Sequence, residues 1–114
     1  MIINTFEEVV AWQKAKDLTV SVYAAFGGSK DFGFKDQIQR ASVSIMNNIA
    51  EGFERRSNKE LKQYLYIAKG SCGETRSMLR LAVELNYLSA EKQEVLVGQA
   101  VEISKMLSGF IKKI

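Results

Sequence analysis

No proline occurs anywhere in the 114 residues of this chain, so nothing in the sequence forces a helix to break. Alanine, leucine, glutamate, lysine and glutamine, which favour helices, are abundant, and no segment alternates in the way that a half-buried strand does. The length suits one domain with its own hydrophobic core. We therefore predict an all-α fold in which residues 1–114 form a single domain.

Apolar residues recur at helical spacing in four stretches, which predicts helices over about residues 5–26, 34–55, 57–86 and 89–114. Thr5 and Ser57 each precede a glutamate by three residues, the spacing of a capping box, and Ser89 is the expected cap of the last helix. The connections are short, so neighbouring helices should run antiparallel. The predicted architecture is a single up-down-up-down four-helix bundle.

Each predicted helix has one apolar stripe that should face the core. Steps of alternately three and four residues suit helices that cross at about 20°. The inner positions are Ala11, Ala15, Leu18, Val22 and Ala25 in the first helix; Phe34, Ile38, Ala41, Ile45, Ile49 and Gly52 in the second; Leu61, Leu65, Ala68, Cys72, Thr75, Leu79 and Ala82 in the third; and Leu96, Ala100, Ile103, Leu107, Phe110 and Ile114 in the fourth.

The second and third helices are apolar beyond these stripes. The additional residues are Val43, Met46, Ala50 and Phe53, followed by Tyr64, Ile67, Met78, Leu81 and Leu85. A broad apolar face can serve a central helix that packs against two neighbours, or it can form a subunit interface, since large exposed apolar patches are rare on monomers. We favour a homo-oligomer.

The run Gln37–Gly52 reads Q-I-Q-R-A-S-V-S-I-M-N-N-I-A-E-G. It resembles the centre of the four-helix-bundle family of 23S rRNA intervening-sequence proteins, and the segments 12–23, 64–74 and 85–88 resemble other parts of that family. The resemblance implies a ring-like homopentamer. It also implies a relation to the accessory proteins of diversity-generating retroelements, which bind nucleic acid and reverse transcriptase. Met46 stands where many relatives carry proline, which puts a kink in the second helix in doubt.

Positive charge is concentrated in the third helix and the turn before it. Residues 55–80 contain seven bases and two acids, whereas the rest of the chain has nine bases and eleven acids. Bases on one helix face with an aromatic between them are typical of a surface that binds the phosphates of RNA or DNA. The candidate nucleic-acid-binding residues are Arg55, Arg56, Lys59, Lys62, Tyr66, Lys69, Arg76 and Arg80.

Other interpretations of this basic surface stay open. It can be a solvated face that keeps the protein soluble. It can also bind a protein partner, either acidic or like a reverse transcriptase, in which case the chain is an interaction scaffold. A metal-dependent nuclease built on Glu51, Glu54 and Glu74 is a remote alternative, since nothing in their spacing demands a shared metal. Lys112 and Lys113 are explained as charges that complement a helix C-terminus.

A second group of polar residues is predicted to form hydrogen bonds inside the bundle or between subunits. Glu74 falls among apolar positions, so we expect it to form a buried or interfacial ion pair with Arg40. Gly70 and Gly73 suggest that another helix backbone comes close. The predicted network or interface residues are Arg40, Ser44, Asn47, Asn48, Glu51 and Glu74.

Several residue types needed for catalysis are scarce. There is no histidine, and the one cysteine, Cys72, has none to activate it. We therefore expect no enzyme activity, metal or cofactor. No segment has the length and hydropathy of a membrane span or the pattern of a signal peptide, and one cysteine fits a reducing compartment. We expect a cytoplasmic protein that does not contact a membrane.

Overall fold

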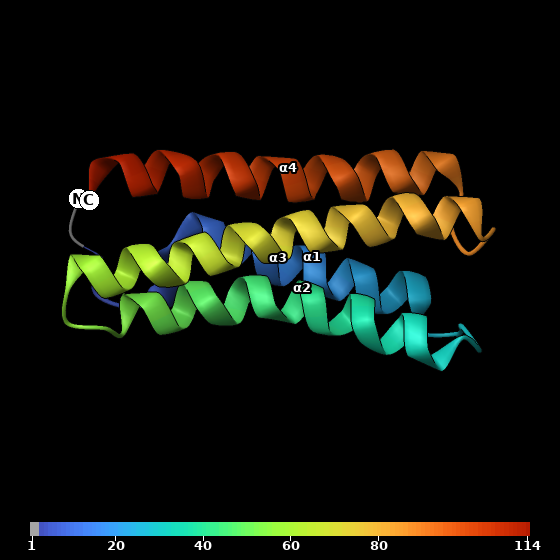
Figure 1. The fold of residues 1–114 in the computed structure, drawn as a ribbon, viewed down its shortest axis with the longest axis horizontal. Coiled ribbons are helices and arrows are strands. Elements are labelled where there is room, and N and C mark those ends of the chain that lie inside the picture. The colour runs from blue at the N-terminus through green and yellow to red at the C-terminus, as the bar shows by residue number, and fades with distance from the viewer. Residues whose placement is uncertain (1–2) are drawn as a thin grey trace.

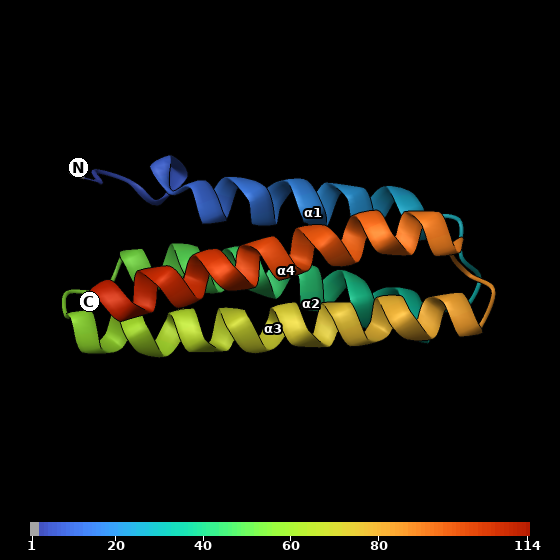
Figure 2. The same ribbon diagram turned by 90° about the horizontal axis from the view of Figure 1, so that it is seen from above.

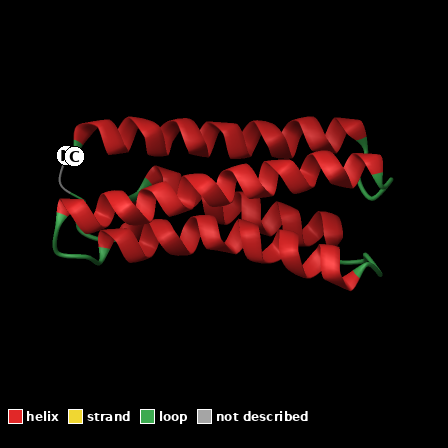
Figure 3. Cartoon of the chain, in the orientation of Figure 1, coloured by secondary structure: helices red, strands yellow, loops and turns green. Residues whose placement is uncertain are grey.

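The helices account for most of the chain, and residues 3–114 of the computed structural model contain no strand (Figure 3). The structure describes these residues, which form a short 3₁₀ helix and four α-helices. Their bounds are η1 Phe6–Glu8, α1 Val10–Phe26, α2 Phe32–Phe53, α3 Asn58–Glu84 and α4 Ala90–Lys113.

The four α-helices lie side by side along the long axis of a 43 × 22 × 19 Å molecule, and each runs antiparallel to the one before it (Figures 1 and 2). α1 packs against α2 and α4, and α3 packs against the same two helices. α4 ends at the end of the bundle where α1 begins. The predicted up-down-up-down bundle is confirmed.

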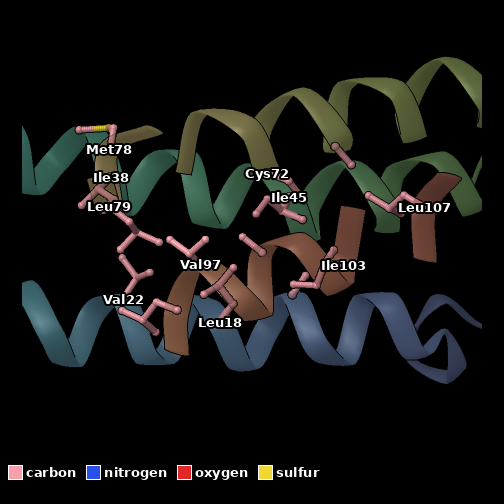
Figure 4. Close-up of a cluster of buried hydrophobic side chains, with 14 of the residues drawn as sticks. Leu18, Val22, Ile38, Ile45, Cys72, Met78, Leu79, Val97, Ile103 and Leu107 are labelled. Atoms are coloured by element: carbon pink, nitrogen blue, oxygen red, sulfur yellow. The ribbon is translucent and has the colours of Figure 1, made fainter. Parts of the chain in front are cut away.

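The core is built mostly from the predicted stripes (Figure 4). All six inner positions of α2 and six of the seven in α3 are buried, while Leu61 is half-buried. Three predicted positions near the helix ends, Ala25, Phe110 and Ile114, are also half-buried, and Phe26 and Ile111 are buried beside them. Val9, Met78, Leu88 and Val97 are buried as well, although they lie outside the predicted stripes. The sequence periodicity therefore located most of the core but not all of it.

Polar side chains begin three of the helices. The hydroxyl of Ser57 accepts a hydrogen bond from the Glu60 N–H at 3.1 Å, and that of Ser89 accepts one from the Lys92 N–H at 3.2 Å. Both predicted caps are confirmed. α2 begins earlier than expected, because the Asp31 carboxylate accepts from the Phe34 N–H at 3.1 Å.

The predicted start of the first helix is wrong. Thr5 makes no capping hydrogen bond, and the Glu8 carboxylate accepts from the Asn4 N–H at 2.9 Å instead. The segment forms the 3₁₀ turn η1, and Val9 then adopts an extended backbone with φ −75° and ψ 118°. The chain therefore enters α1 at Val10 without a side-chain cap.

Asp31 also joins the two loops at one end of the bundle, since it accepts a hydrogen bond from the Tyr87 hydroxyl at 2.7 Å. This bond, followed by the one from the Phe34 N–H, lowers the pKa of Asp31 below 3.8. A carboxylate with a depressed pKa stabilises the fold above its unfolded pKa and stops doing so as the pH falls through its folded pKa.

We expect Asp31→Ala to lower the melting temperature at neutral pH, because both hydrogen bonds are lost. The difference from wild type should shrink as the pH falls from 3.8 through the lower pKa of folded Asp31, because the unfolded chain takes up this proton first and the folded carboxylate then loses its charge. Thermal unfolding followed by circular dichroism over a pH series measures both effects, and Tyr87→Phe should reproduce only part of the neutral-pH loss. A difference that stays constant at acid pH would contradict this role of the carboxylate.

Close helix approach occurs at Gly52 and not at the two glycines of α3. A Cβ atom on Gly52 would lie 3.0 Å from Tyr64 Cβ and 3.1 Å from Leu61 Cδ1. A Cβ on Gly70 or Gly73 would meet nothing within 4 Å. The expectation that another helix backbone approaches these α3 glycines is therefore wrong within the described chain, where they are exposed or half-buried.

Alanine at Gly73 and alanine at Gly52 should change the free energy of unfolding in opposite directions. Gly73→Ala should raise the free energy of unfolding by about 0.5–1 kcal/mol, because alanine favours a helix and finds open space. Gly52→Ala should lower it by about 1–2 kcal/mol, because the new methyl group overpacks the α2–α3 contact. Urea denaturation of the two variants is a matched comparison, and a change of the same sign in both would refute the assignment.

Candidate nucleic-acid interface

Four cations of α3 lie on the side of the helix that faces α4. Lys62, Lys69 and Arg76 follow one another at steps of seven residues, and Arg80 is one turn further on. The Lys69 ammonium donates to the Ser108 hydroxyl of α4 at 2.6 Å, which shows that this row of cations faces α4. We call this side of α3 the basic shoulder. The prediction that these residues share a face is confirmed.

A groove of about 440 Å³ lies where the basic shoulder meets α4. Its charged residues are Arg76 from α3 and Lys105 and Lys112 from α4, and its lining contains no acidic residue. Val101, Ser104, Ser108 and Gly109 complete it. Converging cations that no acid neutralises create a positive potential suited to a phosphate backbone.

Lys105 was not predicted as a site residue, and Lys112 was predicted only to complement a helix C-terminus. Both residues lie on α4, seven residues apart, and their spacing was a usable signal. The spacing alone does not show that Lys105 and Lys112 lie beside Arg76, because that depends on how α3 and α4 are aligned. Lys112 does lie in the last turn of α4, as predicted, and it also lines the groove.

Nearer the start of α3, an exposed aromatic residue continues the basic surface. Tyr66 is 57% exposed. It lines a second hollow, of about 400 Å³, together with Asn58, Lys59, Lys62, Gln63 and Ile114. Tyr66 and its neighbouring lysines are thus brought together, as the sequence predicted.

The remaining predicted cations are placed differently. The Arg55 guanidinium donates to the Tyr64 hydroxyl at 2.6 Å, lies over that ring at 4.8 Å and forms an ion pair with Glu51 at 3.5 Å. Arg80 forms an ion pair with Glu94 at 3.6 Å, in which both side chains are more than half exposed. Such exposed pairs contribute little to stability and are weakened by salt. Arg56 is exposed in the turn before α3.

The opposite side of α3 faces α2 and carries a small polar network. The hydroxyls of Ser44 and Ser71 lie 2.9 Å apart, and the Asn48 amide donates to the Ser44 hydroxyl at 2.9 Å and to the Ser44 carbonyl at 2.8 Å. Ser44 and Asn48 therefore form hydrogen bonds as predicted, and Ser71 is the partner from α3.

The other predicted network residues do not join it. Glu74 is exposed rather than buried, and Arg40 bonds to Asp36 within its own helix at 2.8 Å, so the expected Arg40–Glu74 pair does not form within the chain. Asp36 lies one turn before Arg40 on the same helix, where oppositely charged side chains readily meet. Asn47 is exposed, and Glu51 pairs with Arg55 rather than with a neighbouring helix.

Apolar residues surround Glu74 on this side. Ile67 is 52% exposed and Leu81 47%, and the three residues follow one another at steps of seven. Leu85, at 42%, extends the patch by one turn. We call this set, Ile67, Glu74, Leu81 and Leu85, the apolar shoulder. α3 thus has a basic shoulder beside α4 and an apolar shoulder beside α2.

Comparison with known proteins decides the family. The profile of the family described as 23S rRNA-intervening sequence protein matches residues 7–109. The chain belongs to this family. A crystal structure of a protein of the S23 ribosomal protein family from Bacteroides thetaiotaomicron VPI-5482, described as having unknown function, is 28% identical with a TM-score of 0.84. The similarity covers 90% of this chain and 96% of that one. No curated protein matches the sequence.

In this intervening-sequence family member, α2 continues as one helix across Met46, the position at which the resemblance put a kink in doubt. The Met46 side chain is half-buried and packs against the core. The backbone N–H that methionine retains permits an uninterrupted helix here.

The possible metal ligands of residues 3–114 in this family member are its carboxylates and Cys72. No three cysteine or acidic side chains of this range gather in a way that could hold a metal ion. Burial raises the pKa of the Cys72 thiol to about 12, against the attraction of Arg76 and Lys69, so the thiol stays protonated at neutral pH. No helix in this range has the length and hydropathy needed to cross a bilayer.

Proposed function

We propose that this protein is a non-enzymatic, oligomeric nucleic-acid-binding protein that holds the phosphate backbone of RNA or DNA along the α3–α4 face. The observation that carries this proposal is the groove that Arg76, Lys105 and Lys112 line together and whose lining contains no acidic residue. The basic shoulder and the Tyr66 hollow extend the same surface toward the start of α3.

The family description supports RNA as the first nucleic acid to test, because it refers to intervening sequences of 23S rRNA. Phosphate contacts by lysine and arginine are largely independent of base sequence and depend strongly on salt. The expected behaviour is therefore tight binding at low ionic strength, which weakens steeply as salt is added.

Self-association completes the proposal. Exposed apolar residues occur both on α1, at Val20 (64%) and Tyr23 (46%), and on the apolar shoulder of α3. A ring needs two different and complementary surfaces on each subunit, because its contacts are head-to-tail. A ring of this kind, a pentamer by analogy with what the sequence resemblance implies, would repeat the basic surface and strengthen a weak contact by avidity.

Fluorescence anisotropy with structured RNA, single strands and duplex DNA over a salt series tests this function. Binding that decreases linearly in a plot of log K against log salt supports it. Absence of binding at low salt, with the oligomer intact by light scattering, would refute it.

An acidic or reverse-transcriptase-like protein is the competing occupant of the basic surface. A pull-down performed after nuclease treatment distinguishes the two. A partner that remains bound without nucleic acid would favour a scaffold, whereas a partner lost with the nucleic acid supports our proposal.

A further inference from the structure

Tyr66 is an aromatic residue of α3 with more than half of its surface exposed. Its neighbour Tyr64 is covered by the Arg55 guanidinium, which stacks on the ring and bonds to the hydroxyl. Within residues 3–114, no such ring or cation stacks on Tyr66, and 57% of the residue faces solvent. An aromatic face left open beside cations is suited to a planar ligand.

The surroundings of Tyr66 match the parts of a nucleotide. The Tyr66 ring and Ile114 give the hollow an apolar surface, against which a base can stack. Lys59 and Lys62 carry ammonium groups for a phosphate, and the amides of Asn58 and Gln63 can donate to and accept from the edge of a base.

The flanking positions leave the approach open. Gly70 and Gly73 lie one and two turns after Tyr66 on α3, and no atom lies within 4 Å of where their Cβ atoms would be. Lys69 and Arg76 follow on the basic shoulder. From Lys62 to Arg76 the helix rises about 21 Å, at about 1.5 Å per residue, which leads from the Tyr66 hollow to the Lys105 and Lys112 groove.

We propose that the surface selects unpaired strands: one base stacks on Tyr66, and the adjoining backbone follows the basic shoulder to the groove at Arg76. A base inside a duplex has both faces covered by its neighbours, so it cannot stack on a side chain without being unstacked first. This inference rests on the proposed function and adds a preference for single-stranded RNA or DNA.

Tyr66→Ala should test it in the full-length chain, with labelled oligouridine and oligothymidine of roughly 16 nucleotides and an RNA duplex. Alanine substitution at a stacking aromatic residue weakens single-strand binding by about 5- to 100-fold. We expect a loss of this size for both single strands, an unchanged salt slope, and no change for the duplex. Tyr66→Trp should bind like wild type, because it restores an aromatic face.

Phe32→Ala is the matched control. Phe32 is 69% exposed and has the Lys35 ammonium 5.4 Å from its ring centre, but it begins α2 at the other end of the bundle. It should leave single-strand binding unchanged. Circular dichroism melts verify that each variant is folded.

The outcomes separate this inference from the proposed function. Equal effects of Tyr66→Ala on single strands and duplex, or no effect on either, would overturn the stacking role while the phosphate surface stands. A wild-type protein that binds none of the probes at low salt would overturn both.

Discussion

Replacing Arg76, Lys105 and Lys112 together by glutamate should lower the affinity for single-stranded RNA on the order of 100-fold at about 0.1 M salt. These three side chains line one groove whose lining contains no acidic residue, so they can neutralise adjacent phosphates. Each contact with a single strand contributes about 0.7 to the slope of log K against log salt, and three lost contacts should flatten that slope by about 2. Anisotropy titrations over a salt series measure both quantities.

Lys16, Lys30 and Lys92 provide the control for this experiment. All three are exposed, and they lie on α1, in the connection to α2 and in the first turn of α4, away from the groove. Their replacement by glutamate changes the net charge by the same amount. The control should retain most of the affinity. An equal loss in both triple variants would show that only the overall charge matters and that the groove is no site.

Introducing charge into the apolar shoulder should have the second largest effect. Ile67→Asp together with Leu81→Asp should convert the proposed oligomer into a monomer of 12.8 kDa, measured by light scattering. Both residues are about half exposed in the single chain, so the monomer should keep its fold. In an interface, an unpaired buried carboxylate costs several kcal/mol, more than most subunit contacts tolerate.

Val95→Asp is the control for the apolar shoulder. Val95 is 62% exposed, but it lies on α4 and not beside α2. It should leave the mass unchanged. If avidity contributes to binding, the double variant should also bind RNA more weakly than wild type. If the wild-type protein is a monomer even at high concentration, the proposed ring is refuted.

The fold could be predicted from the sequence because its determinants are local. Ser57 and Ser89 cap their helices through contacts within one turn, and the inner stripes of α2 and α3 need only the helical period. The capping box at Thr5 failed because Glu8 bonds to Asn4 and Val9 is extended. A capping-box sequence shows which hydrogen bonds can form, but it does not show which backbone N–H the glutamate side chain will bind.

The candidate site could be predicted only in part, because the groove depends on contacts between helices. The row Lys62, Lys69 and Arg76 follows from spacing alone, whereas Lys105 joins it only through the alignment of α3 and α4. The expected Arg40–Glu74 pair does not form within the chain for a related reason. Helical phase put Glu74 among apolar residues, but it could not show that this stripe of α3 is exposed in the single chain.

One rigid helix therefore bears two chemically opposite edges. A single residue inserted within α3 would turn every later side chain by about 100° about the helix axis. Cations would then move toward the seam with α2, and leucines would move out into water. Exposed positions of α3 can accept substitutions, but an insertion or deletion between Lys62 and Arg76 would displace both the basic and the apolar residues.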